Sequence, residues 1–384
     1  MGNPAGTNTL LITNNYPSYD DLYNNAFVHT RVREYKKRGY GVDVFRFNGL
    51  YPRGFSEFEG ISVATGEQEQ LVEALRNGRY KTVLVHFLSQ SLWSTIKPEI
   101  KGKRLIVWAH GFEIQSWTRR MHNFTTKEQQ DAAKDGSEKR TLLWQDVFNF
   151  ALAGNNDDIH LVFVSEYLKD CAFEDIGVRL PEGMYSIIHN YINNDQFSYR
   201  EKTAEQRCKI LSIRPFANNN YANDLTVQAI LELSRQPFFE QLSFRIIGNG
   251  ELYETTVAPL TGLSNVHLEQ RFLLQDEIAD LHKEYGVFLV PTRMDTQGVS
   301  RDEAMSSGLV PITNSIAAIP EFVDENCGIL APAEDFKALA NGIIRLFEQP
   351  GLYLSMSHHA AQRVKEQSGA EATIGKEIQL IFIN

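Results

Sequence analysis

Two acidic residues flank a glycine-containing turn in the C-terminal half of this 384-residue chain. Asp295 and Glu303 are separated by seven residues, and Gly298, Val299 and Ser300 lie between them. Carboxylates accept hydrogen bonds from sugar hydroxyls, whereas backbone amides at a helix N-terminus bind phosphate. This order of groups suits a ligand made of sugar, diphosphate and ribose. The alternative is an ordinary turn in which Glu303 only caps its helix, and spacing alone leaves both open.

The residues around this turn predict the elements that position it. The apolar run 287–290 predicts a parallel strand that is buried on both faces. The spacing predicts a helix over 300–307, with Ser300 as N-cap and Glu303 completing a capping box. Gly308 ends that helix, and residues 309–313 predict the next strand.

Two further polar side chains are predicted at the carboxyl ends of strands, where α/β sheets bind their ligands. Arg214 follows the strand predicted at 209–213, and its guanidinium could neutralise a diphosphate. A surface ion pair is the alternative for Arg214. His110 follows the strand predicted at 105–109 and precedes Gly111. We expect His110 to position a sugar, and the alternative is a satisfied structural histidine.

A glycine turn and an aromatic residue complete the candidate set. Gly248 and Asn249 follow the strand predicted at 243–247, and the turn could let a ligand approach the backbone closely. Tight αβ turns use the same residues. Phe272 precedes the helix predicted at 275–284, and we leave open whether it belongs to the core or forms a platform for a base.

The stretch 286–314 resembles the signature of the retaining glycosyltransferases of the GT-B fold, glycosyltransferase family 4 (glycosyl transferases group 1). That signature has a carboxylate, seven residues, a glutamate, then Ala-(Met/Leu)-x-x-Gly and a later Pro-Glu. The matching residues here are Asp295, Glu303, Ala304, Met305, Gly308, Pro320 and Glu321. The family usually has Glu at the position of Asp295.

The resemblance implies two Rossmann-like, doubly wound parallel-sheet domains that face a cleft. It also implies roles for the candidate residues. Arg214 and the amides of Gly298, Val299 and Ser300 would hold the leaving diphosphate. Asp295 would orient the sugar, Glu303 would hold the ribose, and His110 would contact the sugar. Gly248, Asn249 and Phe272 would border the nucleotide.

This sequence departs from the family pattern at two further places. The family has a Lys a few residues after the arginine that matches Arg214, and residues 215–221 contain none. Either another cation substitutes, with Arg271, Arg293 and Arg301 as the candidates, or the enzyme is slow or specialised. The family's Gly-Gly pair in the first loop is replaced by Asn24-Asn25-Ala26.

Alternating apolar runs and helical stretches predict three segments. Residues 1–195 would form an N-terminal Rossmann-like domain on the acceptor side. Residues 196–360 would form a C-terminal Rossmann-like domain that binds the nucleotide sugar. Residues 361–384 would form a helix that packs back on the first domain, as the resemblance implies. Residues 117–140 predict a solvated helix or long loop, with a surface for an acceptor or anionic lipid as the alternative.

Composition narrows the partners and the location. The formal net charge of −10 argues against nucleic acid as a partner. Three scattered cysteines indicate a reducing cytoplasm, and no apolar run approaches the length of a membrane span. We therefore expect a cytoplasmic protein, with peripheral contact at the inner membrane face left open. No Asp-x-Asp triplet occurs, so we predict no metal, and no cofactor beyond the nucleotide-sugar co-substrate.

The predicted activity is therefore a retaining, metal-independent hexosyl- or N-acetylhexosaminyl-transfer. The donor would be a UDP-sugar in preference to a GDP-sugar, and the acceptor a glycan, a lipid-linked sugar or another hydroxyl, in polysaccharide or glycoconjugate biosynthesis. Two alternatives stay open: a sugar-nucleotide hydrolase or epimerase on the same fold, and a non-catalytic nucleotide-sugar-binding partner subunit.

Overall fold

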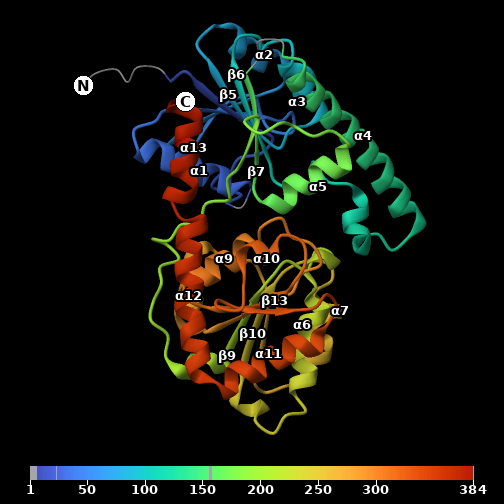
Figure 1. Ribbon diagram of the computed structural model, residues 1–384, viewed down its shortest axis with the longest axis vertical. Coiled ribbons are helices and arrows are strands. Elements are labelled where there is room, and N and C mark those ends of the chain that lie inside the picture. The colour runs from blue at the N-terminus through green and yellow to red at the C-terminus, as the bar shows by residue number, and fades with distance from the viewer. Residues whose placement is uncertain (1–6, 23, 155–157, 384) are drawn as a thin grey trace. The chain divides into compact units, whose positions relative to one another are not determined.

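The computed structural model describes residues 7–22, 24–154 and 158–383. Within that part of the chain, two compact units form, each around its own largely parallel β-sheet (Figure 1). Unit 1 contains residues 7–117, 131–191 and 373–383, and unit 2 contains residues 118–130 and 192–372. The predicted pair of α/β domains is confirmed.

The described part of unit 1 has an eight-stranded sheet in the order β3-β4-β2-β1-β5-β6-β7-β8. Its strands are β1 (Thr9–Thr13), β2 (Asp43–Phe47), β3 (Gly54–Phe58), β4 (Ile61–Gly66), β5 (Thr82–His86), β6 (Arg104–Ala109), β7 (Asp158–Phe163) and β8 (Tyr185–Ile187). Its helices are α1 (Ala26–Lys37), α2 (Gln68–Arg76), α3 (Gln90–Ile96), most of α4 (Lys127–Leu152), α5 (Glu166–Ile176) and α13 (Lys376–Ile378).

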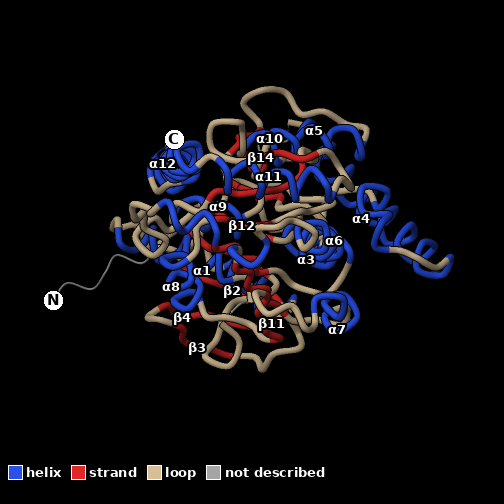
Figure 2. The backbone as a smooth tube through the Cα atoms, turned by 90° about the horizontal axis from the view of Figure 1, so that it is seen from below, coloured by secondary structure: helices blue, strands red, loops and turns tan. Residues whose placement is uncertain are grey.

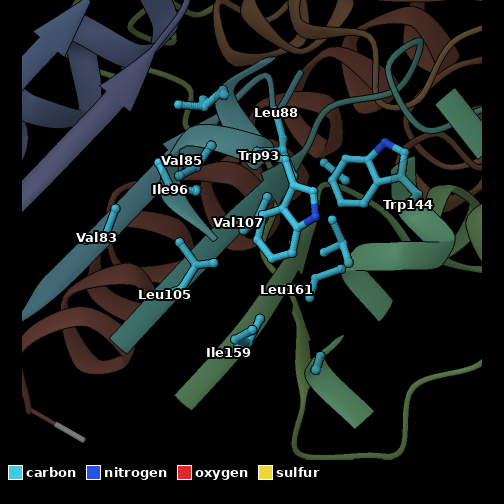
Figure 3. Packing of buried hydrophobic residues seen from close by; sticks show 14 of the residues in the cluster. Val83, Val85, Leu88, Trp93, Ile96, Leu105, Val107, Trp144, Ile159 and Leu161 are labelled. Carbon is cyan, nitrogen blue, oxygen red and sulfur yellow. The ribbon is translucent and has the colours of Figure 1, made fainter. Parts of the chain in front are cut away.

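The central strands of unit 1 are largely apolar because both faces of the sheet are covered. Alternate residues of β5, β6 and β7 point to one face, where they pack against helices α2 to α5. Figure 3 shows this packing around Trp93 and Trp144, with Val83, Val85 and Val107 among the strand residues. The intervening residues of the same strands point to the other face.

That second face is covered by α1 together with the C-terminal segment, which lie side by side in Figure 1. A buried ion pair joins the two: Arg31 Nε donates to Glu377 Oε1 at 3.0 Å, and both side chains are at most 1% exposed. Tyr35 donates its hydroxyl to the other oxygen of Glu377. Arg31 also donates to Asn190 Oδ1 at 2.9 Å. The end of the chain is therefore fixed to α1 by charge as well as by apolar contact.

The described part of unit 2 has a six-stranded parallel sheet in the order β11-β10-β9-β12-β13-β14. Its strands are β9 (Lys209–Ile213), β10 (Ser243–Gly248), β11 (Val266–Gln270), β12 (Val287–Leu289), β13 (Val310–Asn314) and β14 (Ile329–Ala331). Its helices are α6 (Asn223–Leu233), α7 (Tyr253–Val257), α8 (Gln275–Glu284), α9 (Val299–Ser306), α10 (Ile319–Phe322), α11 (Phe336–Glu348) and α12 (Pro350–Ser368).

The edge of the unit 1 sheet is a feature that the apolar pattern did not predict. β3 pairs antiparallel with β4, which lies beside β2 at the outer edge of the sheet (Figure 2). Four of the five β3 residues are exposed, so this strand carries no buried run for sequence reasoning to detect.

The mixed-charge segment 117–140 forms a 3₁₀ segment, Trp117–Asn123, and the first half of α4. Most side chains in that half are exposed, and Lys139 pairs with Asp135 at 2.7 Å one helical turn away. The solvated-helix interpretation is confirmed.

We predict that Glu377→Ala lowers the free energy of unfolding of unit 1 by about 3–5 kcal/mol, because it leaves the Arg31 charge buried without its partner. Urea unfolding, followed by the fluorescence of the unit 1 tryptophans, measures this change. Lys376→Ala is the control, since it removes a neighbouring exposed charge and should change stability by less than about 0.5 kcal/mol. Equal stability of both variants would contradict the prediction.

Candidate functional site

In unit 2, the candidate residues gather where β9, β10 and β12 end. These strands are adjacent and parallel, so their carboxyl ends share one edge of the sheet. Arg214 follows β9, and its amide donates to the carbonyl of Ile247 at 3.0 Å. Asp295 follows β12 after residues 290–294. Segments that lie far apart in the sequence therefore meet at this edge.

Arg214 is a buried cation with few partners. Its residue is 5% exposed, and its Nη1 donates to the hydroxyl of Ser300 at 3.2 Å. The guanidinium carbon lies 4.9 Å from the centre of the Tyr221 ring. Burial lowers the pKa of Arg214, and the negative charge of Asp295 opposes that shift. The Nε atom is buried without a hydrogen-bond partner in the described part of the chain. The alternative of a surface ion pair for Arg214 is therefore wrong.

The helix at the turn, α9, begins earlier than predicted. It starts at Val299, and its N-cap is Gly298, with φ 98° and ψ 60°. The prediction of Ser300 as N-cap in a capping box with Glu303 is wrong. A Cβ at residue 298 would lie 2.8 Å from Arg301 Nη1, so both space and the left-handed backbone favour glycine there. The Ser300 hydroxyl instead accepts the hydrogen bond from Arg214.

The first amides of α9 are positioned to bind an anion. Val299 and Ser300 lie in the first turn, where backbone N–H groups have no partner within the helix. The partial positive charge of the helix N-terminus adds to that of Arg214 in the same place. A buried guanidinium and free helix amides together are the chemistry that recognises a phosphate.

Beneath the turn lies a buried polar network that sequence reasoning missed. Arg301 and Asp302 are each 1% exposed, and Arg301 Nε donates to Asp302 Oδ1 at 3.0 Å. The Gln297 side-chain amide donates to Asp302 Oδ2 at 3.1 Å. Adjacent opposite charges near a helix start are typical of a solvated surface, so the sequence carried no signal of their burial. The network fixes the turn between Gln297 and Asp302.

The two carboxylates of the signature differ in their surroundings. Asp295 is partly exposed, and its Oδ1 accepts from the amide of Gln297 at 3.2 Å. Glu303 is also partly exposed, and its carboxylate makes no hydrogen bond within the described residues. Burial, followed by the negative charge of Asp302, raises the pKa of Glu303 to about 8. Near neutral pH, Glu303 is therefore largely protonated, whereas a ligand that donates hydrogen bonds would favour its ionised form.

The glycine turn after β10 serves close packing of the chain on itself. A Cβ on Gly248 would lie 1.9 Å from the carbonyl oxygen of Arg214, and one on Gly250 would lie 2.3 Å from the carbonyl carbon of Phe216. The Asn249 carbonyl accepts from the amide of Phe216 at 2.8 Å. The close approach of the chain to these glycines agrees with the tight-turn alternative. Ligand binding by Gly248 and Asn249 stays a prediction.

Phe272 does not belong to the core, because 62% of it is exposed. It lies in the loop between β11 and α8. An exposed aromatic ring could support a base, and that role stays a prediction.

The arginines proposed to replace the missing lysine are all neutralised. Arg293 pairs with Asp224 and Glu334 at 2.7 Å each. Arg271 pairs with Glu269 at 2.9 Å and with Glu277 at 2.7 Å, and the Arg301 pair is described above. Their charges are compensated by carboxylates of this chain, which leaves Arg214 in the strongest position to bind an anion.

Tertiary structure brings another cation to the loop that lacks the lysine. Arg120, from the segment that belongs to unit 2, donates to Asn220 Oδ1 at 3.3 Å. Asn220 in turn donates to the carbonyl of Met294, next to Asp295, at 2.8 Å. Sequence reasoning included Arg120 only in a mixed-charge surface, since nothing local indicates this contact.

In unit 1, His110 follows β6 and contacts another histidine. Its Nε2 lies 2.9 Å from Nδ1 of His86, the last residue of β5. Glu113 accepts hydrogen bonds from the amides of both His110 and Gly111. Burial lowers the pKa of His110 well below its usual value, with a further contribution from the positive charge of Arg31. His110 is therefore neutral at physiological pH.

The first loop of unit 1 shows how asparagine replaces the glycine pair. Asn25 adopts a left-handed backbone with φ 56°, and its side chain donates to Asn14 Oδ1 at 3.0 Å. Asparagine tolerates this conformation better than most residues because its side chain bonds locally. His29, four residues on, is a buried structural residue that contacts the Tyr16 hydroxyl at 2.8 Å and Glu59 at 3.2 Å.

Comparison with solved structures places this architecture in the GT-B fold. Sucrose-phosphate synthase from Thermosynechococcus elongatus aligns with a TM-score of 0.71 and 16% identity, over 97% of this chain and 98% of that one. The HepE protein from Anabaena, solved with UDP and glucose, aligns with a TM-score of 0.65 and 14% identity, over 96% of this chain and 98% of that one. The predicted fold is confirmed.

Residues 207–349, which contain the whole signature, match the family model described as glycosyl transferases group 1. N-acetyl-alpha-D-glucosaminyl L-malate synthase from Bacillus anthracis is 24% identical over 208 residues, which are 51% of this chain. The match spans 53% of that relative, about half of its length. Residues 207–349 therefore match the group 1 glycosyltransferases, and the architecture of the described residues is that of the GT-B fold, as the signature indicated.

Two kinds of feature are absent from the described residues. No helix there is long and apolar enough to cross a membrane. No cluster of three or more His, Cys, Asp or Glu side chains is arranged there to hold a metal ion.

We predict that Glu303→Gln flattens the dependence of the melting temperature on pH. In the native protein Glu303 keeps its proton up to about pH 8, whereas the unfolded chain loses it near its ordinary value. Its contribution to stability is therefore full below about pH 4.5 and is lost as the pH rises to about 8. Melting curves of wild type and variant should diverge between pH 5 and pH 8, with the variant more stable at the upper end. Parallel curves would contradict the raised pKa.

Proposed function

We propose that this protein transfers a hexosyl or N-acetylhexosaminyl group from a nucleotide sugar to a hydroxyl acceptor, with retention of configuration. The single observation that carries the proposal is the buried Arg214 guanidinium beside the amino end of α9. A buried cation without a carboxylate hydrogen bond gains most from an anionic ligand, and a sugar diphosphate supplies that anion.

The neighbouring groups match the rest of such a ligand. Asp295 precedes the turn and would accept hydrogen bonds from sugar hydroxyls. Glu303 would accept them from the ribose, and this contact would draw off its proton, because the ionised carboxylate is the stronger acceptor. Phe272 would lie against the base, with Gly248 and Asn249 bordering the nucleotide.

The chemistry would depend on the stabilisation of a departing diphosphate. As the bond between the sugar and the phosphate breaks, negative charge grows on the leaving oxygen. Arg214 and the amides of Gly298, Val299 and Ser300 would stabilise it electrostatically, without a metal ion in this scheme. The departing phosphate would help to take the proton of the acceptor hydroxyl on the same face of the sugar.

The comparisons support the choice of ligand class. The HepE structure contains UDP and glucose, and a structure of TarM from S. aureus contains UDP and alpha-GlcNAc-glycerol. We therefore favour a UDP-sugar over a GDP-sugar as donor. The acceptor would be a glycan, a lipid-linked sugar or another hydroxyl compound of polysaccharide or glycoconjugate biosynthesis, and peripheral contact with a membrane would be compatible with it.

We predict that Arg214→Gln weakens UDP binding about 10- to 100-fold, because a hydrogen bond to a charged group contributes about 1.5–3 kcal/mol. Isothermal titration calorimetry of the purified full chain measures the affinity. Arg235→Gln is the matched control, since it removes an equal charge from an exposed side chain of unit 2. A similar loss in both variants would assign the effect to overall charge and would contradict the proposed site.

We predict that Asp295→Ala and Glu303→Ala separate catalysis from binding. Asp295→Ala should keep the thermal shift that UDP produces and lose about 100-fold in transfer rate, because sugar orientation is lost. Glu303→Ala should lose the thermal shift itself. At ~100 times its dissociation constant, a ligand stabilises the wild type by ~2.7 kcal/mol, a readily measured shift.

Screening UDP, GDP, ADP and their sugars against the wild type decides between the alternatives. Release of UDP that requires an acceptor supports transfer. Release of free sugar without an acceptor would instead indicate a hydrolase, and interconversion of nucleotide sugars would indicate an epimerase. Nucleotide binding without turnover of any donor would indicate a non-catalytic partner subunit.

A further inference from the structure

An arginine is buried near the carboxyl end of β2 in unit 1. Arg46 is 7% exposed, and in the sheet it pairs with Thr13 of β1 and with Thr65 of β4. Residues that pair across adjacent strands direct their side chains to the same face of the sheet. That face is the one covered by α1, because Val44, two residues earlier, belongs to the apolar cluster of that helix.

Few groups of the protein bind this guanidinium. Nε of Arg46 donates to Thr65 Oγ1 at 3.1 Å, and the guanidinium carbon lies 3.9 Å from the centre of the Tyr51 ring. Nη1 and Nη2 form no hydrogen bond within the described residues, and solvent still reaches them. Burial lowers the pKa of Arg46, and Tyr51 opposes that shift. Arg46 has therefore lost most of its water and keeps the N–H donors of both Nη atoms for a ligand.

The neighbouring carboxylates are bound by other cations. Glu67, which follows β4, pairs with Arg53 at 2.6 Å. Glu59, in the turn between β3 and β4, pairs with Arg33 at 2.6 Å. Within the described residues, no carboxylate forms a hydrogen bond or an ion pair with Arg46. A buried cation in this state gains more from an anionic ligand than from a neutral one.

The beginning of α1 lies beside this arginine. Asn24 donates to the Tyr51 hydroxyl at 2.9 Å, and Asn25, the N-cap of α1, donates to Thr13 Oγ1 at 3.4 Å. The Tyr51 ring contacts the Arg46 guanidinium, and Thr13 is the sheet partner of Arg46. The first turn of α1 holds no acidic residue, and the Asn25 side chain does not cap it. The first amides of α1 therefore add positive potential close to that of Arg46.

We propose that Arg46 and the first turn of α1 form a second anion site, which binds the carboxylate or phosphate group of a small acid. Residues of unit 1 alone build this site. Its role rests on the proposed function, in which the bound acid is the acceptor of the sugar. The acceptor is then a hydroxy acid, an acidic sugar or a phosphate ester, and a neutral glycan is a poor acceptor.

The acid group takes no part in the bonds that change. The hydroxyl oxygen of the acceptor forms the new bond to the sugar, and the bond between the sugar and the diphosphate breaks. The hydroxyl proton leaves with the diphosphate. The carboxylate or phosphate at Arg46 keeps its charge throughout, so Arg46 is a binding and specificity residue.

Matched pairs of probes test the site in the wild-type full chain. D-glucuronate is compared with D-glucose, and glycerol 3-phosphate with glycerol, by isothermal titration calorimetry at constant ionic strength. We expect at least one acid to bind about 10-fold or more tightly than its neutral analogue, because only the acid forms charge-assisted hydrogen bonds. The pair that differs shows whether carboxylate or phosphate is recognised. Equal affinities within both pairs, or no binding of either acid, would overturn the proposal.

Two variants assign the binding to Arg46. Arg46→Gln should weaken binding of the acid about 10- to 100-fold and leave the affinity of its neutral analogue unchanged. Arg53→Gln is the matched control, because it removes an equal charge from a more exposed side chain nearby, and the acid affinity should stay within about twofold. An equal loss in both variants, or wild-type affinity in a folded Arg46→Gln, would overturn the proposal.

Chemical modification makes the assignment without a variant if Arg46→Gln fails to fold. Phenylglyoxal modification of the wild type is followed by mass spectrometry of the peptides that contain Arg46 and Arg53. The bound acid should slow the modification of Arg46 about 10-fold and leave that of Arg53 unchanged. Equal rates of Arg46 modification with and without the acid would overturn the proposal.

Failure of this inference and failure of the proposed function give different results. The probes bind in the absence of a donor, whereas the proposed function is measured by UDP binding and sugar transfer. If the acids do not bind and transfer to a neutral acceptor occurs, the proposed function stands and the anion site is overturned. If acid binding depends on Arg46 and no sugar is transferred, the anion site stands, and its acceptor role fails together with the proposed function.

Discussion

The burial of one positive charge at the end of β9 is the interaction on which the candidate site depends. Arg214 is held by a neutral hydroxyl, an aromatic face and the field of a nearby carboxylate. A charge removed from water is costly unless strong partners compensate for it. The amides at the head of α9 add positive potential at the same place, and this combination is the basis of the proposed diphosphate site.

Three other arginines of unit 2 differ from Arg214 because each forms an ion pair with a carboxylate of this chain. Arg271, Arg293 and Arg301 also lie near the ends of strands or beside the turn, and each is paired with at least one carboxylate. Arg301 uses its charge within the protein, since it fixes Gln297 and Asp302 below the turn. Of these four arginines, Arg214 alone forms no hydrogen bond or ion pair with a carboxylate within the described residues, and Arg301 stabilises the turn that leads into α9.

Two local sequence patterns make contacts in the structure that the sequence did not predict. Ser300 has the residue type and spacing of an N-cap, yet its hydroxyl bonds to Arg214 and Gly298 caps the helix. Gly248 lies in a turn that the sequence predicted could admit a ligand, and the backbone after β9 fills the space that a side chain would need there. In both cases the local pattern indicated a residue with a particular structural role. The contacts of that residue were determined by a segment distant in the sequence.

The sequence by itself determined most of the buried strands and the match to the glycosyltransferase signature. Short apolar runs separated by segments of helical periodicity indicate strands that are buried on both faces. This pattern can be recognised in the sequence because it depends only on residues that are neighbours in the chain. The signature from Asp295 to Glu321 is equally local, which is why it identified the glycosyltransferase class before any contact was known.

Only the tertiary structure decided which side chains share their protons and charges. The contact between His86 and His110 depends on the register of β5 against β6. The burial of Arg301 with Asp302, and the closure of Glu377 on Arg31, depend on how whole elements pack. These contacts join residues that are from one to 346 positions apart. Their energies depend on the exclusion of water, which no single stretch of sequence specifies.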